Sequence, residues 1–200
     1  MIKNKAIFLD RDGVINDLVY YPEEGLLDSP NSAKQFSLIP RVIESLKIFK
    51  KLGYFLILIS NQPGIAKEKY TYDEFLRIKN KMESLLNASD VNFDDQFYCL
   101  HHPQSKINNY KLKCDCRKPN TKLVLDAIEK FELDIKNCFY VGDGLVDLQL
   151  AKSLNCKSVY IGNLNSTISN LFLGKNLTPN FIAHDLFEAA QFIESKTKLS

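Results

Sequence analysis

Residues 6–13 read AIFLDRDG, an apolar run that ends in two aspartates and a glycine. A short continuous apolar run of this kind is typical of a strand buried on both faces of a parallel sheet. Ligands of such sheets bind beyond the carboxyl ends of the strands, where Asp10 and Asp12 would lie. A lone D-x-D sequence is more often a solvated turn, because aspartate is common in turns. A functional interpretation therefore needs support from other segments.

The rest of the chain alternates apolar runs with helical patterns. Five runs predict buried strands, at residues 6–9, 54–59, 97–100, 138–141 and 157–161. Amphipathic periodicity predicts helices at residues 41–52, 71–86, 121–131, 145–154 and 185–194. This alternation predicts an α/β fold with a doubly wound, mostly parallel sheet. Two stretches without periodicity, residues 17–37 and 101–113, are expected to be long functional or mobile loops.

Length and composition describe an ordinary globular chain. Its 200 residues predict one domain over residues 1–195, followed by a polar tail at 196–200 that we expect to be frayed. The 26 basic and 24 acidic residues are too balanced for a protein that mainly coats nucleic acid. No apolar run approaches the roughly 20 residues of a membrane span. The start of the chain lacks a signal-peptide pattern, so we expect a cytoplasmic protein without membrane contact.

Three further segments place polar groups after strands or before helices. Residues 60–62 read SNQ, residues 117–119 read RKP and residues 141–147 read VGDGLVD. With residues 10–12 they supply acids for a metal, a hydroxyl and a lysine for a phosphate, and a carboxylate free to attack. This combination favours phosphate chemistry over a solvated turn.

The ordered segments DRDGVIN, SNQPGIA, CLHHP, CDCRKP and VGDGLVD resemble the haloacid-dehalogenase superfamily of aspartate-nucleophile phosphatases. More narrowly, they resemble its histidinol-phosphatase and heptose-bisphosphatase branch. The resemblance covers about residues 6–155. It implies a Rossmann-like fold, and the short interval between the first two motifs leaves no room for a large inserted cap domain. We therefore expect an open active site.

The resemblance also implies a role for each matching residue. Asp10 would attack phosphorus and become an aspartyl-phosphate, and Asp12 would act as general acid and base. A catalytic Mg²⁺ would bind Asp10, Asp143 and the Asp12 backbone carbonyl, since oxygen ligands suit this ion. The carboxylate of Asp147 is either a helix N-cap or a group that steadies the site from behind.

The remaining matches are to phosphate and substrate contacts. Ser60 and Lys118 would hold the phosphoryl oxygens, although a helix cap and a solvated lysine are the structural alternatives. Asn61 and Gln62 would frame the pocket. Arg117 would recognise the substrate, through a second phosphate if one is present.

Cysteine and histidine residues form a second pattern. The five cysteines are an odd number, which disfavours a complete disulfide framework. Cys99, His101, Cys114 and Cys116 would suit tetrahedral Zn²⁺, and their spacing matches the zinc loop of this branch. The alternatives are buried thiols with surface histidines, or His102 as the imidazole ligand. We expect a structural zinc that positions the residues directly after Cys116.

These residues predict a phosphatase that acts on a small phosphorylated metabolite and works as a monomer. A heptose bisphosphate is the first candidate substrate, and histidinol phosphate is the alternative. A zinc-containing nucleic-acid-binding module ranks lower, because the net charge is only +2 and no aromatic stacking series lies beside the metal ligands. We therefore expect no nucleic-acid partner.

Overall fold

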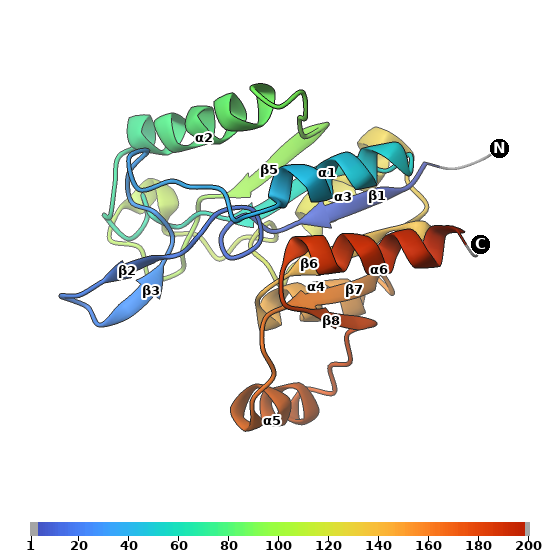
Figure 1. The fold of residues 1–200 in the computed structure, drawn as a ribbon. Coiled ribbons are helices and arrows are strands. Elements are labelled where there is room, and N and C mark those ends of the chain that lie inside the picture. Colours follow the sequence, from blue (N-terminus) through green and yellow to red (C-terminus); the bar gives the residue numbers. More distant parts are fainter. Residues whose placement is uncertain (1–3, 199–200) are drawn as a thin grey trace.

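The computed structural model describes residues 4–198 and confirms the predicted parallel sheet (Figure 1). Six strands lie in the order β5-β4-β1-β6-β7-β8, and every neighbouring pair is parallel. The strands are β1 (Ala6–Leu9), β4 (Phe55–Asn61), β5 (Asp95–Cys99), β6 (Phe139–Gly142), β7 (Lys157–Ile161) and β8 (Phe181–Ala183).

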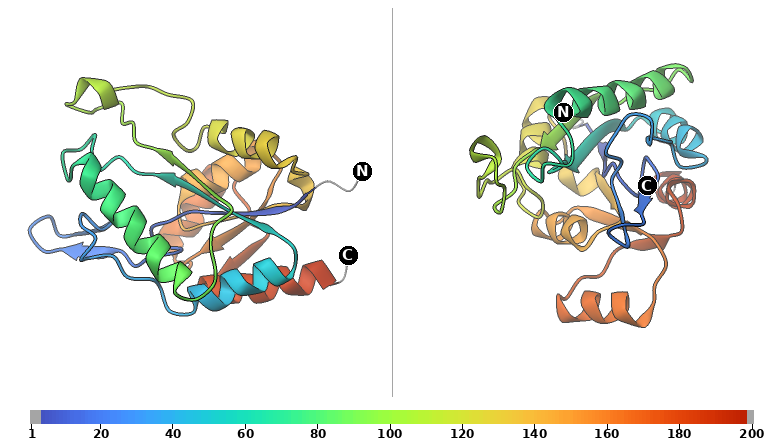
Figure 2. Two further views of the ribbon diagram at one scale, coloured as in Figure 1. Left: turned by 90° about the horizontal axis from the view of Figure 1, so that it is seen from above. Right: turned by 90° about the vertical axis from the view of Figure 1, so that its left-hand side faces the viewer.

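Helices cover both faces of this sheet (Figure 2). One face carries α1 (Val42–Lys51), α2 (Tyr72–Asn87) and α6 (Leu186–Lys198), and the other carries α3 (Lys122–Phe131) and α4 (Leu145–Ser153). Alternate residues of β1 enter the two cores: Ile7 and Leu9 pack in the first, Phe8 in the second. This burial on both faces explains why the strand is a continuous apolar run.

The stretch 17–37 is not the irregular loop that we expected. It contains an antiparallel hairpin of β2 (Val19–Tyr21) and β3 (Leu26–Asp28), which projects from the body of the molecule (Figure 1). Gly25 lies in the connecting turn with a φ of 65°, a conformation that glycine adopts without a Cβ penalty. The strands were missed because none of their side chains is fully buried, so no apolar alternation marks them.

The carboxyl-terminal part differs from the prediction in three elements. Helix α5 (Ser166–Gly174) and strand β8 were not predicted, because α5 buries only Phe172 and β8 has three residues. Helix α6 continues to Lys198, so the last described residues are helical rather than a frayed tail. An ion pair of 2.7 Å between Glu194 and Lys198 supports this last turn.

The second long stretch, residues 101–113, contains only the short 3₁₀ helix η1 (Asn108–Tyr110). Within residues 4–198, no helix combines the length and apolar character that a bilayer crossing requires.

Candidate active site

The predicted site residues converge at the carboxyl end of the sheet. Asp10 directly follows β1, Ser60 and Asn61 end β4, and Asp143 directly follows β6. The strands β4, β1 and β6 are neighbours in the sheet. From β1 the chain passes to β4 and β5 on one side of β1, and then crosses to β6, β7 and β8 on the other side. The site therefore lies where the direction of winding reverses, which is where parallel sheets open a crevice.

Lys118 is the buried cation of this site. Its side chain is 1% exposed, and its ammonium lies 2.8 Å from Asp10 and 2.7 Å from Asp147. It also donates to the carbonyl of Ile59 at 3.0 Å. Burial by itself would lower the pKa of Lys118, but the two carboxylates raise it well above its ordinary value. Lys118 is therefore a fixed positive charge rather than a solvated lysine.

Asp147 is not the N-cap of α4, which is Gly144, but as the third residue of the helix it supports both the helix start and the site. One carboxylate oxygen accepts from the backbone N–H of Gly144 at 3.1 Å and so supports the first turn of α4. The other forms the ion pair with Lys118, and Asp147 as a whole is buried. The start of α4 is thus tied directly to the cation of the site.

The acids Asp10, Asp143 and Asp147 form an oxygen-rich cluster. One carboxylate oxygen from each lies within 4.8 Å of the others. Burial raises the pKa of Asp143 to about 8, and the charges of Asp10 and Asp147 add to the rise. Burial also raises the pKa of Asp10 to about 6, although Lys118 opposes it. Three crowded acids with one lysine among them fit a divalent cation that prefers oxygen ligands.

Gly13 keeps space for this cluster. A Cβ at Gly13 would lie 2.1 Å from a carboxylate oxygen of Asp143, and the residue has a φ of 77°. Any side chain at this position would therefore displace Asp143. The glycine after the D-x-D pair is required by this close approach as well as by the turn.

Asp12 is held by three donors. Its carboxylate accepts from Arg11 at 2.9 Å, from Asn16 at 3.0 Å and from Gln62 at 2.6 Å. Arg11 is fully buried, and no role was predicted for it from the sequence. Buried arginine is rarely without a partner, but the sequence pattern does not show that this arginine is buried. Arg11 and Asn16 fix the direction in which the Asp12 carboxylate points.

A cavity of about 240 Å³ opens at this cluster. Asp10, Asp12, Asp143, Asn61 and Arg117 contribute to its wall, together with residues of the hairpin and of the turn after β4. The three other predicted residues lie behind this wall and are nearly fully buried: Ser60, Gln62 and Lys118.

Gln62 differs most from its predicted role as a substrate contact. Its amide donates to Asp12 at 2.6 Å and to the hydroxyl of Ser60 at 3.0 Å. It therefore links the two residues instead of facing the cavity. The sequence could not distinguish these roles, because both need a polar residue directly after the strand.

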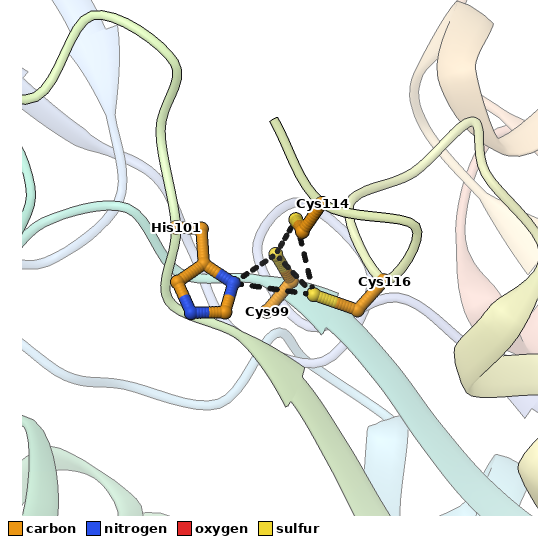
Figure 3. Close-up of side chains that lie close together, drawn as sticks. All are labelled: Cys99, His101, Cys114 and Cys116. Atoms are coloured by element: carbon orange, nitrogen blue, oxygen red, sulfur yellow. Dashed lines mark hydrogen bonds between the residues drawn. The ribbon is translucent and has the colours of Figure 1, made fainter. Parts of the chain in front are cut away.

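The predicted zinc ligands form a compact cluster (Figure 3). The thiols of Cys99, Cys114 and Cys116 lie 3.1–3.5 Å apart, and Nδ1 of His101 is 3.4 Å from the Cys116 sulfur. Tetrahedral zinc with bonds of about 2.3 Å separates its sulfurs by about 3.8 Å. The cluster is slightly tighter than this, and its four donor atoms point toward one another. The donor set and its arrangement fit Zn²⁺.

The alternative histidine ligand and the other two cysteines lie outside this cluster. All five cysteines are free thiols, and Cys138 and Cys156 are buried in the core, as expected. The alternative ligand His102 instead accepts from the backbone N–H of Gln104 at 3.2 Å.

The thiol cluster connects directly to the acid cluster. Arg117 and Lys118 follow Cys116, and Asn61 binds Lys118 reciprocally: its Oδ1 accepts from the Lys118 N–H at 3.0 Å and its amide donates to the Lys118 carbonyl at 3.2 Å. Arg117 donates to the carbonyl of His101 at 3.4 Å. We call residues 100–118, which follow β5, the cysteine loop. Asn61 thus fastens the end of this loop to the end of β4.

A phosphatase is the class of protein that this site and the comparisons with known proteins together define. The model of the family described as polynucleotide kinase 3 phosphatase matches residues 19–155. Two curated relatives are D-glycero-beta-D-manno-heptose-1,7-bisphosphate 7-phosphatases. The Haemophilus influenzae protein is 41% identical over 146 residues, which are 73% of this chain and 74% of the relative. The Escherichia coli K12 protein is 38% identical over 150 residues, 75% and 74% of the two chains. The chain belongs to the phosphatase family that this model describes, and these two proteins are its relatives.

A solved structure supports the fold. The D,D-heptose 1,7-bisphosphate phosphatase of B. bronchiseptica, complexed with magnesium and phosphate, superposes with a TM-score of 0.77. The alignment covers 96% of this chain and 99% of that chain at 24% sequence identity.

Proposed function

We propose that this protein is a Mg²⁺-dependent phosphatase that converts D-glycero-D-manno-heptose 1,7-bisphosphate to the 1-phosphate. The observation that carries the proposal is the buried Lys118 between Asp10 and Asp147, directly behind a small open cavity. The activity of the relatives at about 40% identity supplies the substrate. A heptose bisphosphate would make the protein a supplier of precursors for surface glycans such as lipopolysaccharide.

Asp10 acts as the nucleophile in the proposed reaction. Its carboxylate oxygen forms a bond to phosphorus while the bond between phosphorus and the sugar oxygen breaks, which leaves an aspartyl-phosphate. Water then attacks the same phosphorus, and phosphate departs as Asp10 is restored. The ammonium of Lys118 lies 2.8 Å from Asp10 and favours the ionised form of this nucleophile. Its positive charge also stabilises the negative charge that builds on the phosphoryl oxygens in the transition state.

Asp12 moves the protons. It protonates the leaving sugar oxygen in the first step and accepts a proton from the attacking water in the second. Its carboxylate is 16% exposed and lies at the cavity, so it can reach both oxygens. Ser60 supports this arrangement through Gln62, which donates to both side chains.

The metals have separate tasks. Asp10, Asp143 and the Asp12 backbone carbonyl would hold Mg²⁺, with Asp147 behind them, and the ion would supply charge neutralisation for the phosphoryl group. Cys99, His101, Cys114 and Cys116 would hold a structural Zn²⁺ that orders the loop leading to Arg117 and Lys118.

We place the enzyme in the cytoplasm as a monomer with a single domain over residues 1–195, and without a nucleic-acid partner. The odd number of cysteines, five, supports this placement, because complete disulfide frameworks are typical of oxidising compartments.

The test is phosphate release in the presence of Mg²⁺ from heptose 1,7-bisphosphate and, in parallel, from histidinol phosphate. We expect a strong preference for the bisphosphate and loss of turnover in Asp10→Asn. Asp126→Asn is the matched control, since it removes an exposed carboxylate that pairs only with Lys122 on the surface of α3.

Each failure has a distinct meaning. A preference for histidinol phosphate would keep the chemistry and overturn the substrate. Turnover that survives in Asp10→Asn would overturn the mechanism.

A further inference from the structure

Three cations line the cavity in front of Asp10: Lys67, Lys69 and Arg117. They do not have equal freedom to bind a ligand. Lys69 lies 2.7 Å from Asp28 and 3.5 Å from Glu24, so the hairpin already neutralises its charge. Lys67 forms no ion pair with a carboxylate within residues 4–198, and its side chain is exposed. Its charge remains available to a ligand in the cavity.

The backbone fixes Lys67 in place. Its N–H donates to the carbonyl of Pro63 at 2.8 Å, inside the turn that follows β4. The two preceding residues, Ile65 and Ala66, are 5% and 1% exposed and anchor this turn in the protein interior. The ammonium therefore extends from a rigid base, and a bound anion would order only the side chain.

Arg117 and Lys67 both belong to the wall of the cavity. Arg117 follows Cys116 directly in the chain, and Lys67 lies in the turn after β4. The charges that act most strongly on Asp10 and Asp143 come instead from Lys118 and the neighbouring carboxylates. The cavity wall thus combines the acids of the reaction centre with two cations, Lys67 and Arg117, that form no ion pair with those acids within residues 4–198.

We propose that Lys67, together with Arg117, binds the second, non-reacting phosphate of the substrate and so selects bisphosphates over monophosphates. This inference rests on the proposed function and adds Lys67 to it as a residue that determines specificity. Arginine offers a planar fork to a phosphate, whereas lysine offers a point charge, and the two together would hold a dianion from two directions.

The test compares heptose 1,7-bisphosphate with heptose 7-phosphate in wild type and in Lys67→Gln. We expect the ratio of kcat/KM for the two substrates to fall roughly 10–100-fold, as for loss of a hydrogen bond to a charged group. The matched control is Lys106→Gln, an exposed lysine 3.6 Å from Glu68 that does not line the cavity; it should keep the wild-type ratio.

A binding measurement gives a second readout without turnover. In the Asp10→Asn background, calorimetric titration measures the affinity for each substrate. Lys67→Gln should weaken binding of the bisphosphate, relative to binding of the monophosphate, by the same factor. An unchanged ratio in both experiments would overturn the role of Lys67. A wild-type enzyme that turns over both substrates equally would instead overturn the proposed substrate, so the two failures can be told apart.

Discussion

At the scale of single residues, the site depends on charges that are buried together. Lys118 forms ion pairs with Asp10 and Asp147, and Arg11 forms an ion pair with Asp12. Both cations are buried. Removing one member of such a set leaves an uncompensated buried charge, which costs about 3–5 kcal/mol. The protein therefore couples its stability to the ionisation state that the reaction requires.

Lys118→Met tests this coupling. We expect kcat to fall about 10²–10³-fold, because the variant loses the positive charge beside Asp10. The melting temperature should also fall, since the partners of Lys118 stay buried. Steady-state kinetics and thermal unfolding measure the two effects. Lys122→Met is the control, because this exposed lysine forms its ion pair with Asp126 on the surface of α3. Wild-type kinetics in Lys118→Met would contradict the account.

The sequence predicted the members of the site better than their contacts. Asp10, Asp143 and Lys118 converge because the ends of adjacent parallel strands and the chain after Cys116 meet at one edge. The partner of Asp12 was missed, because nothing in the pattern DRDG shows whether the arginine points inward. Likewise, the spacing SNQ does not distinguish a residue at the cavity from one behind it.

At the scale of elements, two loops shape the opening of the site. The hairpin of β2 and β3 contributes Leu18, which precedes β2, and Leu27 to the cavity, and Lys69 fastens it to the turn after β4. The cysteine loop contributes Arg117 and places Lys118. The sequence marked both stretches as non-periodic, but the hairpin could not be foreseen, because its strands are short and largely exposed.

We expect loss of the metal from the cysteine loop to lower activity. Cys116→Ser should lower the zinc content measured by atomic spectroscopy and lower activity by about tenfold or more, because the next two residues lose their anchor. Cys156→Ala is the control, since this buried cysteine lies outside the cluster. A variant that loses zinc but keeps full activity would show that the loop does not depend on the metal.

At the scale of the whole molecule, the topology concentrates function at one end of the sheet. The strands β4, β1 and β6 end together, and the helices on both faces bury the apolar residues beneath them. A larger cavity of about 800 Å³ includes Asn4 and Lys5, which precede β1, and none of the predicted site residues line it. In Figure 1, α5 lies apart from the sheet, consistent with its small contribution to the core.

The crowded acids predict how global stability depends on pH and Mg²⁺. The folded pKa of Asp143, about 8, lies above its ordinary value of 3.8, so the metal-free folded state holds a proton that the unfolded state releases. Stability of the metal-free protein should therefore fall as pH rises from about 4 to 8. Because Mg²⁺ binds the ionised carboxylates, its stabilising effect should be larger at pH 8 than at pH 6.

Thermal unfolding with and without Mg²⁺ at both pH values measures this effect. Asp143→Asn should remove most of the pH dependence of the Mg²⁺ shift. A Mg²⁺ shift that is larger at pH 6 would contradict the role of the acid cluster.

The central claim is that Asp10 carries the phosphoryl group during turnover. The most direct measurement is acid quenching of the enzyme during steady-state turnover of heptose 1,7-bisphosphate, followed by mass spectrometry of the peptide that contains Asp10. We predict a fraction of this peptide with the mass of one added phosphoryl group on Asp10, and none in Asp10→Asn. Rapid turnover with Asp10 unmodified at every quench time, together with activity that survives in Asp10→Asn, would contradict the account.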